Sequence, residues 1–285
     1  MKLSCLSLFL SLCLYLSPGA SFPVSPAINN ALRRTQLPIA PADQFLVESK
    51  PVDDLTTIKY DDNHQESPLS MPDWSTTHLL ARRLLARSST GILSTVYPKA
   101  GRDPSLAGVP VGLPDYYADC ASQDDPELHD LLGLGNPLIL ALNLGTSFRN
   151  AKAGSNISLA IDWWHKGPSN NDGSLDTSPS ALPRLSLIGS LQPIPTTLPA
   201  ASKKAIEKCF LAVHADAKHW LPGSPDAAHS GYWARIVVEK AFWVGGFGDR
   251  ARIGWLNPRT WRDIEKNGKD GKRGWADVRL PGEKP

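Results

Sequence analysis

The stretch FWVGGFGDRARIGWL, residues Phe242–Leu256, decides between two classes of fold. Its residues 246–251 fit the G-x-G-x-x-G/A pattern of dinucleotide-binding loops, which requires a preceding strand and a helix that opens at the end of the loop. A strand pattern precedes the loop, but the residues after it include Ile, Gly and Trp and soon reach Pro258. The stretch therefore predicts a corner or bulge between two strands, where glycine permits positive φ or lets a ligand or second subunit approach the backbone. The glycines of this corner are Gly245, Gly246 and Gly248.

Strand patterns surround this corner: several segments alternate apolar and polar residues, and residues 136–144 form a nearly continuous apolar run that is typical of a buried strand. One strand pattern precedes the corner at 232–246 and another follows at 251–256. Five earlier patterns succeed one another without a regular helix between them, which excludes a doubly wound parallel sheet. The order predicts a mostly antiparallel sheet or barrel with a few helices packed outside it. The five earlier patterns are 90–98, 111–120, 136–144, 155–164 and 184–191, and the residues expected to point inward are Leu159, Ile161, Leu187, Val237 and Phe242.

Three helices complete the expected order of elements. The first starts at Asp73, a good N-cap residue, and continues with an apolar stripe. The second spans 202–214, before the long strand pattern. The last starts at Asn257, with Pro258 at its first helical position. The stripe of the first helix is formed by Leu80, Ala81, Leu84 and Leu85.

Composition divides the chain into four parts. Residues 1–20 combine Lys2 with a short apolar run and small residues, which is typical of a secretory signal peptide. Residues 21–72 are rich in Pro, Ser, Asp and Asn, and this predicts a flexible or pro-like segment. Residues 73–265 are long enough for one domain with its own core. Residues 266–285 carry basic residues interspersed with Gly and Asp, which predicts a polar, solvated tail.

Two cysteines, Cys120 and Cys209, remain outside the predicted signal peptide. An oxidising compartment would permit one disulfide between them. Cys209 also falls on one helical face with Ile206, Phe210 and Val213, where a cysteine is often a small buried hydrophobe. The sequence leaves both possibilities open.

Charge and motifs narrow the function classes. The formal net charge of +2 is too small to indicate a basic surface that binds nucleic acids. No nucleophile elbow, zinc signature or paired-carboxylate arrangement stands out. Asp115 and Asp119 alternate along one strand pattern and resemble an acid pair, but an edge-strand or turn position explains them as well.

The order of several motifs resembles that of CREG-type proteins, which are secreted glycoproteins of the FMN-binding split-barrel superfamily related to pyridoxamine 5′-phosphate oxidases. The resemblance covers about residues 73–265. It implies a six-stranded antiparallel split β-barrel with flanking helices, and a homodimer with a protein or glycan-receptor partner. The motifs are ARRLLARSSTGILSTV, GVPVGLPDYYAD, SFRNAKAGSNISLAI, HADAKHW and YWARIVVEKAFWVGGFGDRARI.

The same resemblance suggests where a flavin would bind. In flavin-binding relatives, basic and hydroxyl side chains hold the FMN phosphate at the dimer interface. The matching segment here contains Thr146, Ser147, Arg149 and Asn150. Arg149 could pair bidentately with a phosphate, or it could brace the surface of a loop. The fuller basic signature of the oxidases is absent, and CREG-type members are regarded as having lost the flavin site.

The GGFG segment also resembles haem-handling split barrels, in which a histidine near the C-terminal end ligates iron. The histidines in the second half of this chain are His214, His219 and His229, and none follows the GGFG segment. They form no cluster with metal-ligand spacing. His214 and His219 fit the end of a helix, where imidazolium is favoured.

Asn156 begins the sequon Asn-Ile-Ser, a plausible glycosylation site in a secreted chain. The sequence thus favours a secreted or vacuolar CREG-like glycoprotein that acts by binding. An FMN-dependent oxidoreductase is the alternative, and a haem-binding split barrel is the third reading.

Overall fold

The computed structural model describes residues 72–101, 103–122, 125–164, 178–225 and 227–283. The predicted signal peptide and all of the pro-like segment except its last residue lie outside these ranges. The described part forms one unit, and the elements below belong to it.

Seven strands form one antiparallel sheet, and six of them follow the order β2-β1-β4-β5-β6-β3. The long strand β6 pairs with β5 on one side and with both β3 and β7 on the other. This architecture confirms the expected antiparallel split-barrel class. The strands are β1 (Thr90–Val96), β2 (Pro110–Tyr116), β3 (Leu138–Leu142), β4 (Ile157–Asp162), β5 (Arg184–Pro193), β6 (Gly231–Gly245) and β7 (Arg252–Leu256).

A single bridge joins the two ends of this strand order. Just after β2, Ala118 faces Leu138 at the start of β3 in an antiparallel bridge. The two residues exchange both backbone hydrogen bonds, at 3.0 and 2.8 Å. The sheet therefore curls until its two terminal strands meet, and its concave side encloses the main core.

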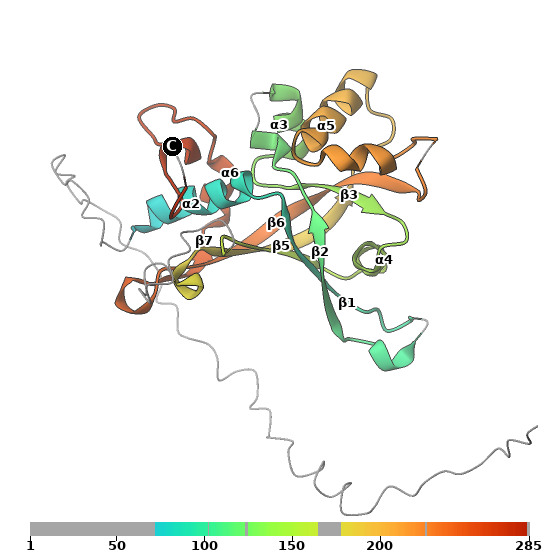
Figure 1. Cartoon of the computed structure of the whole chain (residues 1–285), viewed down its shortest axis with the longest axis horizontal. Helices are drawn as coiled ribbons and strands as arrows, with labels where there is room; N and C mark the ends of the chain where they lie inside the picture. Colours follow the sequence, from blue (N-terminus) through green and yellow to red (C-terminus); the bar gives the residue numbers. More distant parts are fainter. Residues whose placement is uncertain (1–71, 102, 123–124, 165–177, 226, 284–285) are drawn as a thin grey trace, which may run out of the picture. The chain divides into compact units, whose positions relative to one another are not determined.

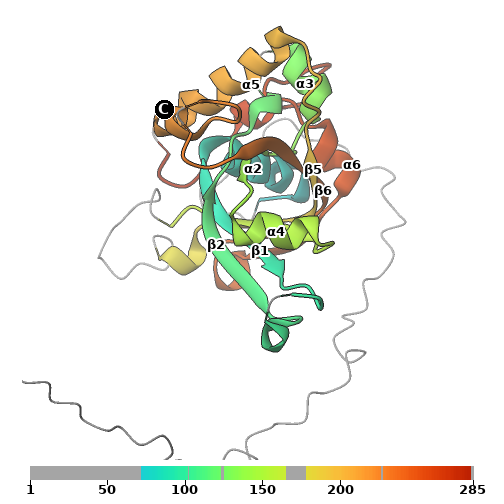
Figure 2. The same ribbon diagram turned by 90° about the vertical axis from the view of Figure 1, so that its right-hand side faces the viewer.

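The helices lie around the sheet, with α3 close to α5 and α2 close to α6 (Figure 1). Asp73 caps α2 by accepting a hydrogen bond from the backbone N–H of Thr76, and Asn257 caps α6, as the sequence predicts. Two short helices, α3 and α4, were expected as loops. Figure 2 shows α4 beside β1 and β2. The helices are α2 (Trp74–Arg87), α3 (Pro126–Leu132), α4 (Thr146–Lys152), α5 (Ala200–Val213) and α6 (Pro258–Asp263).

The inward-facing residues agree with the sequence prediction on β4 and β5 but not on β6. Leu159, Ile161 and Leu187 are buried, as expected. Val237 and Phe242 are only half-buried, and the buried positions of β6 are their neighbours instead. Val237 and Phe242 are five positions apart, so a regular strand would turn them to opposite faces. The extra β6 residue opposite Ile188 and Gly189 instead turns both of them to the outer face. The buried β6 positions here are Ile236, Val238, Ala241 and Trp243.

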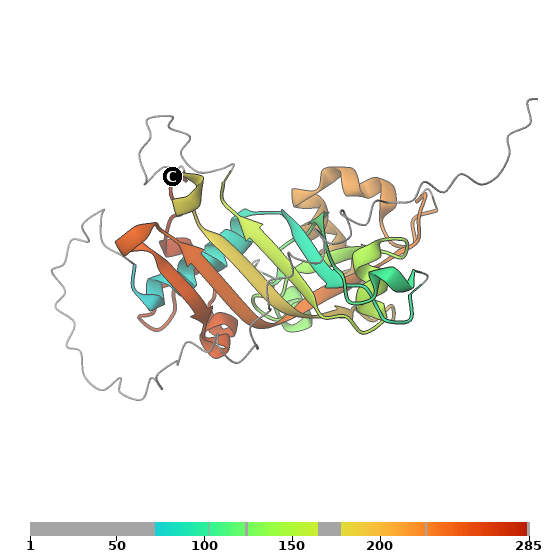
Figure 3. The same cartoon turned by 90° about the horizontal axis from the view of Figure 1, so that it is seen from below.

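The opposite face of the sheet carries a row of aligned side chains that crosses five strands. The paired registers place Ile92 of β1 next to Ala160, then Ser186, Phe242 and finally Trp255 of β7. We call this row, with its neighbours Ile188, Val244 and Ile253, the outer sheet face. In Figure 3 the strands lie side by side, with α2 beyond them.

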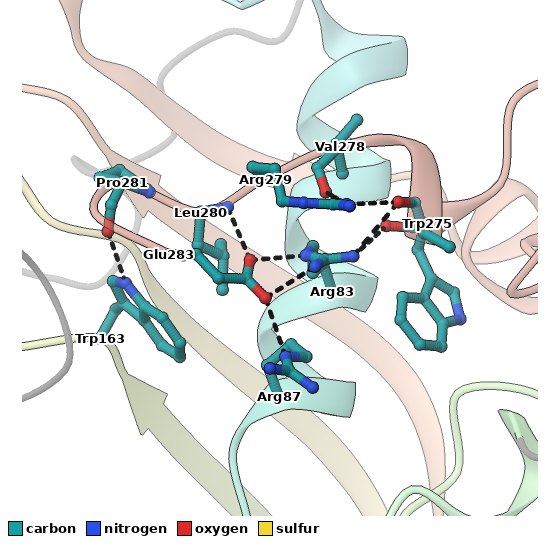
Figure 4. Close-up of polar contacts among 10 residues, drawn as sticks. Arg83, Arg87, Trp163, Trp275, Val278, Arg279, Leu280, Pro281 and Glu283 are labelled. Carbon is teal, nitrogen blue, oxygen red and sulfur yellow. Dashed lines mark hydrogen bonds and ion pairs between the residues drawn. The ribbon is translucent and has the colours of Figure 1, made fainter. Parts of the chain in front are cut away.

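The segment after residue 265 is folded, so the expected solvated tail is wrong for its described part. Trp275, Val278 and Leu280 are buried. Glu283 receives two hydrogen bonds from Arg83 of α2, at 2.6 and 2.7 Å, and one from Arg87 (Figure 4). These ion pairs tie the C-terminal segment to α2. The lysines and glycines of this segment suggested a solvated tail, but its apolar residues pack into the fold.

Candidate functional site

The glycine-rich stretch is a structural corner between β6 and β7. Gly246 and Gly248 have φ values of 75° and 61°, in the left-handed region that favours glycine. A Cβ on Gly246 would collide with the backbone oxygen of Arg250. The backbone after the corner continues as β7 and not as a helix, so it lacks the helix N-terminus that a dinucleotide pyrophosphate needs.

The segment expected to resemble a flavin-phosphate region is helix α4. Ser147 and Asn150 lie on its buried side, and the side-chain amide of Asn150 donates to Thr95 Oγ1 at 3.1 Å. Arg149 is exposed, and its guanidinium donates to Thr146 Oγ1 at 3.4 Å. The helix thus brings Thr146 and Arg149 together but turns Asn150 away to brace β1.

A pocket of about 310 Å³ lies against the start of α4. Residues from β2, β3, α4, α5 and the 3₁₀ helix η6 (Ala215–Trp220) contribute to its wall. Most of them are apolar, four are aromatic, and one carries a charge. The lining consists of Thr90, Pro114, Asp115, Tyr116, Leu140, Leu142, Leu144, Gly145, Phe148, Phe210 and Trp220.

The charged side chain of this pocket is Asp115. It is half-buried, and its Oδ1 accepts a hydrogen bond from the backbone N–H of Tyr116 at 2.8 Å. Burial raises the pKa of the Asp115 carboxyl, and the single hydrogen bond does not cancel this effect. The protein's hydrogen bond to this carboxylate therefore does not fully replace the hydration that the carboxylate loses on burial.

Tyr116 forms the adjoining wall and is held in place from two sides. Its hydroxyl donates to Asp216 Oδ2 at 3.0 Å, and its ring stacks on His214 with the centroids 4.2 Å apart. His214 is buried, and its Nε2 lies 2.9 Å from the backbone oxygen of Tyr117. Phe210 also packs against His214, with the ring centroids 4.8 Å apart, and completes this small aromatic cluster.

The structure resolves the open question of the two cysteines, because Cys120 and Cys209 form a disulfide with their Cα atoms 6.0 Å apart. The bond joins the 3₁₀ helix η3 (Cys120–Ser122) to α5. Phe210 follows Cys209 directly and lines the pocket. The disulfide therefore anchors one wall of the pocket, and the reading of Cys209 as an isolated hydrophobe is wrong.

The lining of this pocket does not fit the phosphate of FMN. A phosphate is bound by arginine, lysine, hydroxyl groups and backbone N–H groups. Among the described residues that line it there is no lysine, arginine or histidine, and the charged one is Asp115. Arg149 is exposed beside Thr146 and is not part of this wall.

The histidines do not assemble a metal centre. His214 belongs to the buried aromatic cluster, and His219 and His229 are exposed. Within the residues that the structure describes, no group of three or more His, Cys, Asp or Glu side chains could hold a metal ion. Over the same residues, no helix has the length and apolar character needed to cross a membrane.

Asp119 does not form an acid pair with Asp115, because it belongs to a separate buried cluster. Its Oδ2 lies 3.8 Å from the fully buried guanidinium of Arg82. Burial raises the pKa of the Asp119 carboxyl, and the nearby Arg82 opposes this shift. Arg82 also donates to the backbone oxygens of Trp261 and Ile264 and to Ser122 Oγ. Sequence reasoning missed this cluster, since an arginine on an apolar helix face is ordinarily solvated.

Several solved structures have a similar fold. A protein of unknown function from Agrobacterium tumefaciens str. C58 is 19% identical over 69% of this chain and 64% of its own, with a TM-score of 0.43. A heme-binding protein from Mycobacterium smegmatis is 20% identical over 66% of this chain and 61% of its own, with a TM-score of 0.43. The chain thus spans slightly less than two thirds of each of these proteins.

A third similar structure is HutZ, the heme storage protein from Vibrio cholerae, which is 12% identical over 59% of this chain and 93% of its own, with a TM-score of 0.35. No curated protein matches this chain in sequence. The model of the family described as CREG, beta-barrel matches residues 72–263, which contain all seven strands and all five helices named above. The chain therefore belongs to the CREG β-barrel family.

Proposed function

We propose that this protein is a secreted or vacuolar CREG-type glycoprotein that acts by binding, as a homodimer, and does not catalyse a flavin-dependent reaction. One observation carries the proposal: among the residues that the structure describes, the pocket beside α4 is lined by the carboxylate of Asp115 and by no basic side chain. A flavin oxidoreductase of this fold would need cations at its phosphate site. A protein that acts by binding needs no such cations, and the barrel then serves as a rigid scaffold for its binding surfaces.

The decisive experiment measures flavin binding directly. Protein secreted by a eukaryotic host is purified and its absorbance is recorded at about 450 nm, where a bound flavin absorbs. The protein is then titrated with FMN, with a flavin oxidase of the superfamily as the positive control. We expect no flavin absorbance and no saturable FMN binding. Stoichiometric FMN that is weakened by roughly 1.5–3 kcal/mol in Arg149→Ala would replace the proposal with the oxidoreductase alternative.

Two features support the secreted location. The N-terminal pattern of Lys2 and the apolar run Leu3–Leu16 is that of a signal peptide. The disulfide Cys120–Cys209 is of the kind that persists in oxidising compartments. Mass analysis of the secreted protein is expected to find its N-terminus near Ser21. Protein that still begins at Met1 would contradict this part of the proposal.

The glycan belongs at Asn156, which is exposed immediately before β4. Digestion with a peptide N-glycosidase is expected to lower the mass of the secreted protein. Asn156→Gln removes that shift, whereas Asn143→Gln, an exposed asparagine outside any sequon, retains it. An unchanged shift in Asn156→Gln would show that the glycan is elsewhere.

The homodimer surface that we propose is the outer sheet face. Ile92 and Trp255 are 40% and 57% exposed there, and the small residues Ala160 and Ser186 lie between them in the same row, where they would allow a partner to approach closely. An apolar strip can bury itself against its own copy by two-fold symmetry. Trp255→Glu is therefore expected to yield monomers in light scattering, whereas Val213→Glu on α5 leaves the mass unchanged. Dimers that persist in Trp255→Glu would argue for another surface.

A further inference from the structure

The pocket beside α4 combines aromatic walls with one acidic group. Its rings come from four different elements, so they surround the cavity from several sides. The carboxylate of Asp115 lies at the end of β2. The rings are those of Tyr116, Phe148, Phe210 and Trp220.

We propose that this pocket binds a small organic amine, with its apolar body among the aromatic rings and its ammonium group against Asp115. The inference rests on the proposed function, because the acidic lining that argues there against FMN is the feature that would attract an ammonium group. It adds to that function the chemical class of a ligand.

The charges of the wall favour a cation over an anion or a neutral molecule. Ring faces attract ammonium groups through their quadrupole, and a carboxylate adds a charge-assisted hydrogen bond. Asp115 is half-buried and has a raised pKa, so an incoming ammonium would supply the compensation that the free pocket lacks. A second carboxylate, Asp216, accepts a hydrogen bond from the hydroxyl of the lining residue Tyr116.

The size of the pocket limits the ligand. Its volume of about 310 Å³ is at the low end of the range of about 300–1,000 Å³ for ligand pockets. A molecule with one ring and a short amine arm suits it better than a flavin. Leu144 is 52% exposed at the pocket, so part of the wall remains in contact with solvent.

Side chains of the pocket wall are also fixed before any ligand binds, which reduces the conformational entropy that the protein loses on binding. Tyr116 is fixed between Asp216 and His214. Phe210 follows the disulfide-bonded Cys209. These restraints act on side chains that line the pocket and do not depend on a ligand being present.

The test uses the full secreted protein and three probes with the same aromatic body. Phenethylamine is cationic, 2-phenylethanol is neutral and phenylacetate is anionic at pH 7. Binding is followed by calorimetry and by tryptophan fluorescence, since Trp220 lines the pocket. We expect phenethylamine to bind about tenfold more tightly than 2-phenylethanol, in keeping with a charge-assisted hydrogen bond, and phenylacetate to bind most weakly.

Two variants tie this preference to the pocket. Asp115→Asn keeps an acceptor for the Tyr116 N–H and is expected to reduce phenethylamine to the affinity of 2-phenylethanol. Asp130→Asn, an exposed aspartate of α3 outside the lining, is the matched control and leaves the ranking unchanged. Leu144→Lys places a cation at an exposed position of the wall, so it is expected to weaken phenethylamine and strengthen phenylacetate.

Equal affinities for the amine and the alcohol, no binding of any probe, or an unchanged ranking in folded Asp115→Asn would each overturn the inference. An FMN titration of the same preparation separates this failure from failure of the proposed function. Saturable FMN binding together with any of these three outcomes would sink both. Absence of both FMN and amine binding would sink only the amine site.

Discussion

At the residue scale, the two positive-φ glycines of the β6–β7 corner differ in a way that can be measured. A Cβ at Gly246 meets the backbone oxygen of Arg250, whereas a Cβ at Gly248 has no atom within 4 Å. Gly246→Val should therefore lower the free energy of unfolding by about 1–3 kcal/mol, and Gly248→Ala should cost less. Thermal denaturation with and without NAD or FMN checks this. Variants that melt like the parent but lose a nucleotide that the parent binds would support a phosphate loop instead.

The buried pair of Arg82 and Asp119 gives a second residue-scale prediction. Arg82→Met leaves the Asp119 carboxyl in the interior without its cation and should destabilise the protein by about 3–5 kcal/mol. The double variant Arg82→Met/Asp119→Leu removes both charges and should cost less than the sum of the two single changes. Urea unfolding of all four proteins measures the coupling. Strict additivity would show that the two groups stabilise the fold independently.

At the element scale, the C-terminal segment should make stability depend on acid pH. Burial alone would raise the pKa of Glu283, but hydrogen bonds from Arg83 and from the Leu280 N–H, with the charges of Arg83 and Arg87, hold it below its ordinary value of 4.5. The stabilisation is therefore complete above pH 4.5 and is lost as the pH falls through the lower folded-state pKa.

The variant Glu283→Gln tests this direction of the pH dependence of stability. The variant is expected to be less stable than the parent at pH 7, and the difference should shrink as the pH falls below 4.5. Thermal unfolding at several pH values measures it. A difference that stays constant down to pH 2 would show that the side chain acts through its shape and not through its charge.

The elements also show how far sequence reasoning reaches. Apolar alternation, one continuous apolar run at 136–144, helical apolar faces and the Asp73 and Asn257 caps identified the seven strands and three helices. Helix α4 was missed because seven residues span about two turns, which is too short for an apolar stripe to be read. Val237 and Phe242 of β6 were assigned to the wrong face, because β6 carries apolar residues on both faces and its sequence does not show the bulge that puts these two on the same side.

The candidate site was predicted less well than the fold. The sequence pointed to Arg149 through a family resemblance, but the pocket is built by Asp115 and Tyr116 of β2 and by Phe210 of α5, two segments that lie far apart in the chain. Only the curled sheet and the disulfide bring them together. Local sequence patterns describe residues that are close together in the chain, so they could not predict which distant residues line this pocket.

At the scale of the whole molecule, the disulfide constrains the unfolded chain. It joins residues that are 89 apart in sequence, and a loop of about this length is worth roughly 4–5 kcal/mol in the chain-entropy account. Cys209→Ser is expected to lower the free energy of unfolding by about 2–5 kcal/mol. Guanidinium unfolding of the variant and the parent checks it, and an unchanged midpoint would contradict it.

The same bond decides what a single proteolytic cut can do. Strands β3, β4 and β5 all lie between Cys120 and Cys209, so a peptide bond broken anywhere in that interval leaves both fragments covalently joined. A nicked molecule would keep its mass on a non-reducing gel and separate into two bands only after a thiol is added. Because each fragment contributes strands to the sheet, it would also keep its pairing. Cleavage in this interval would break the backbone at one point but would not separate the molecule into two parts.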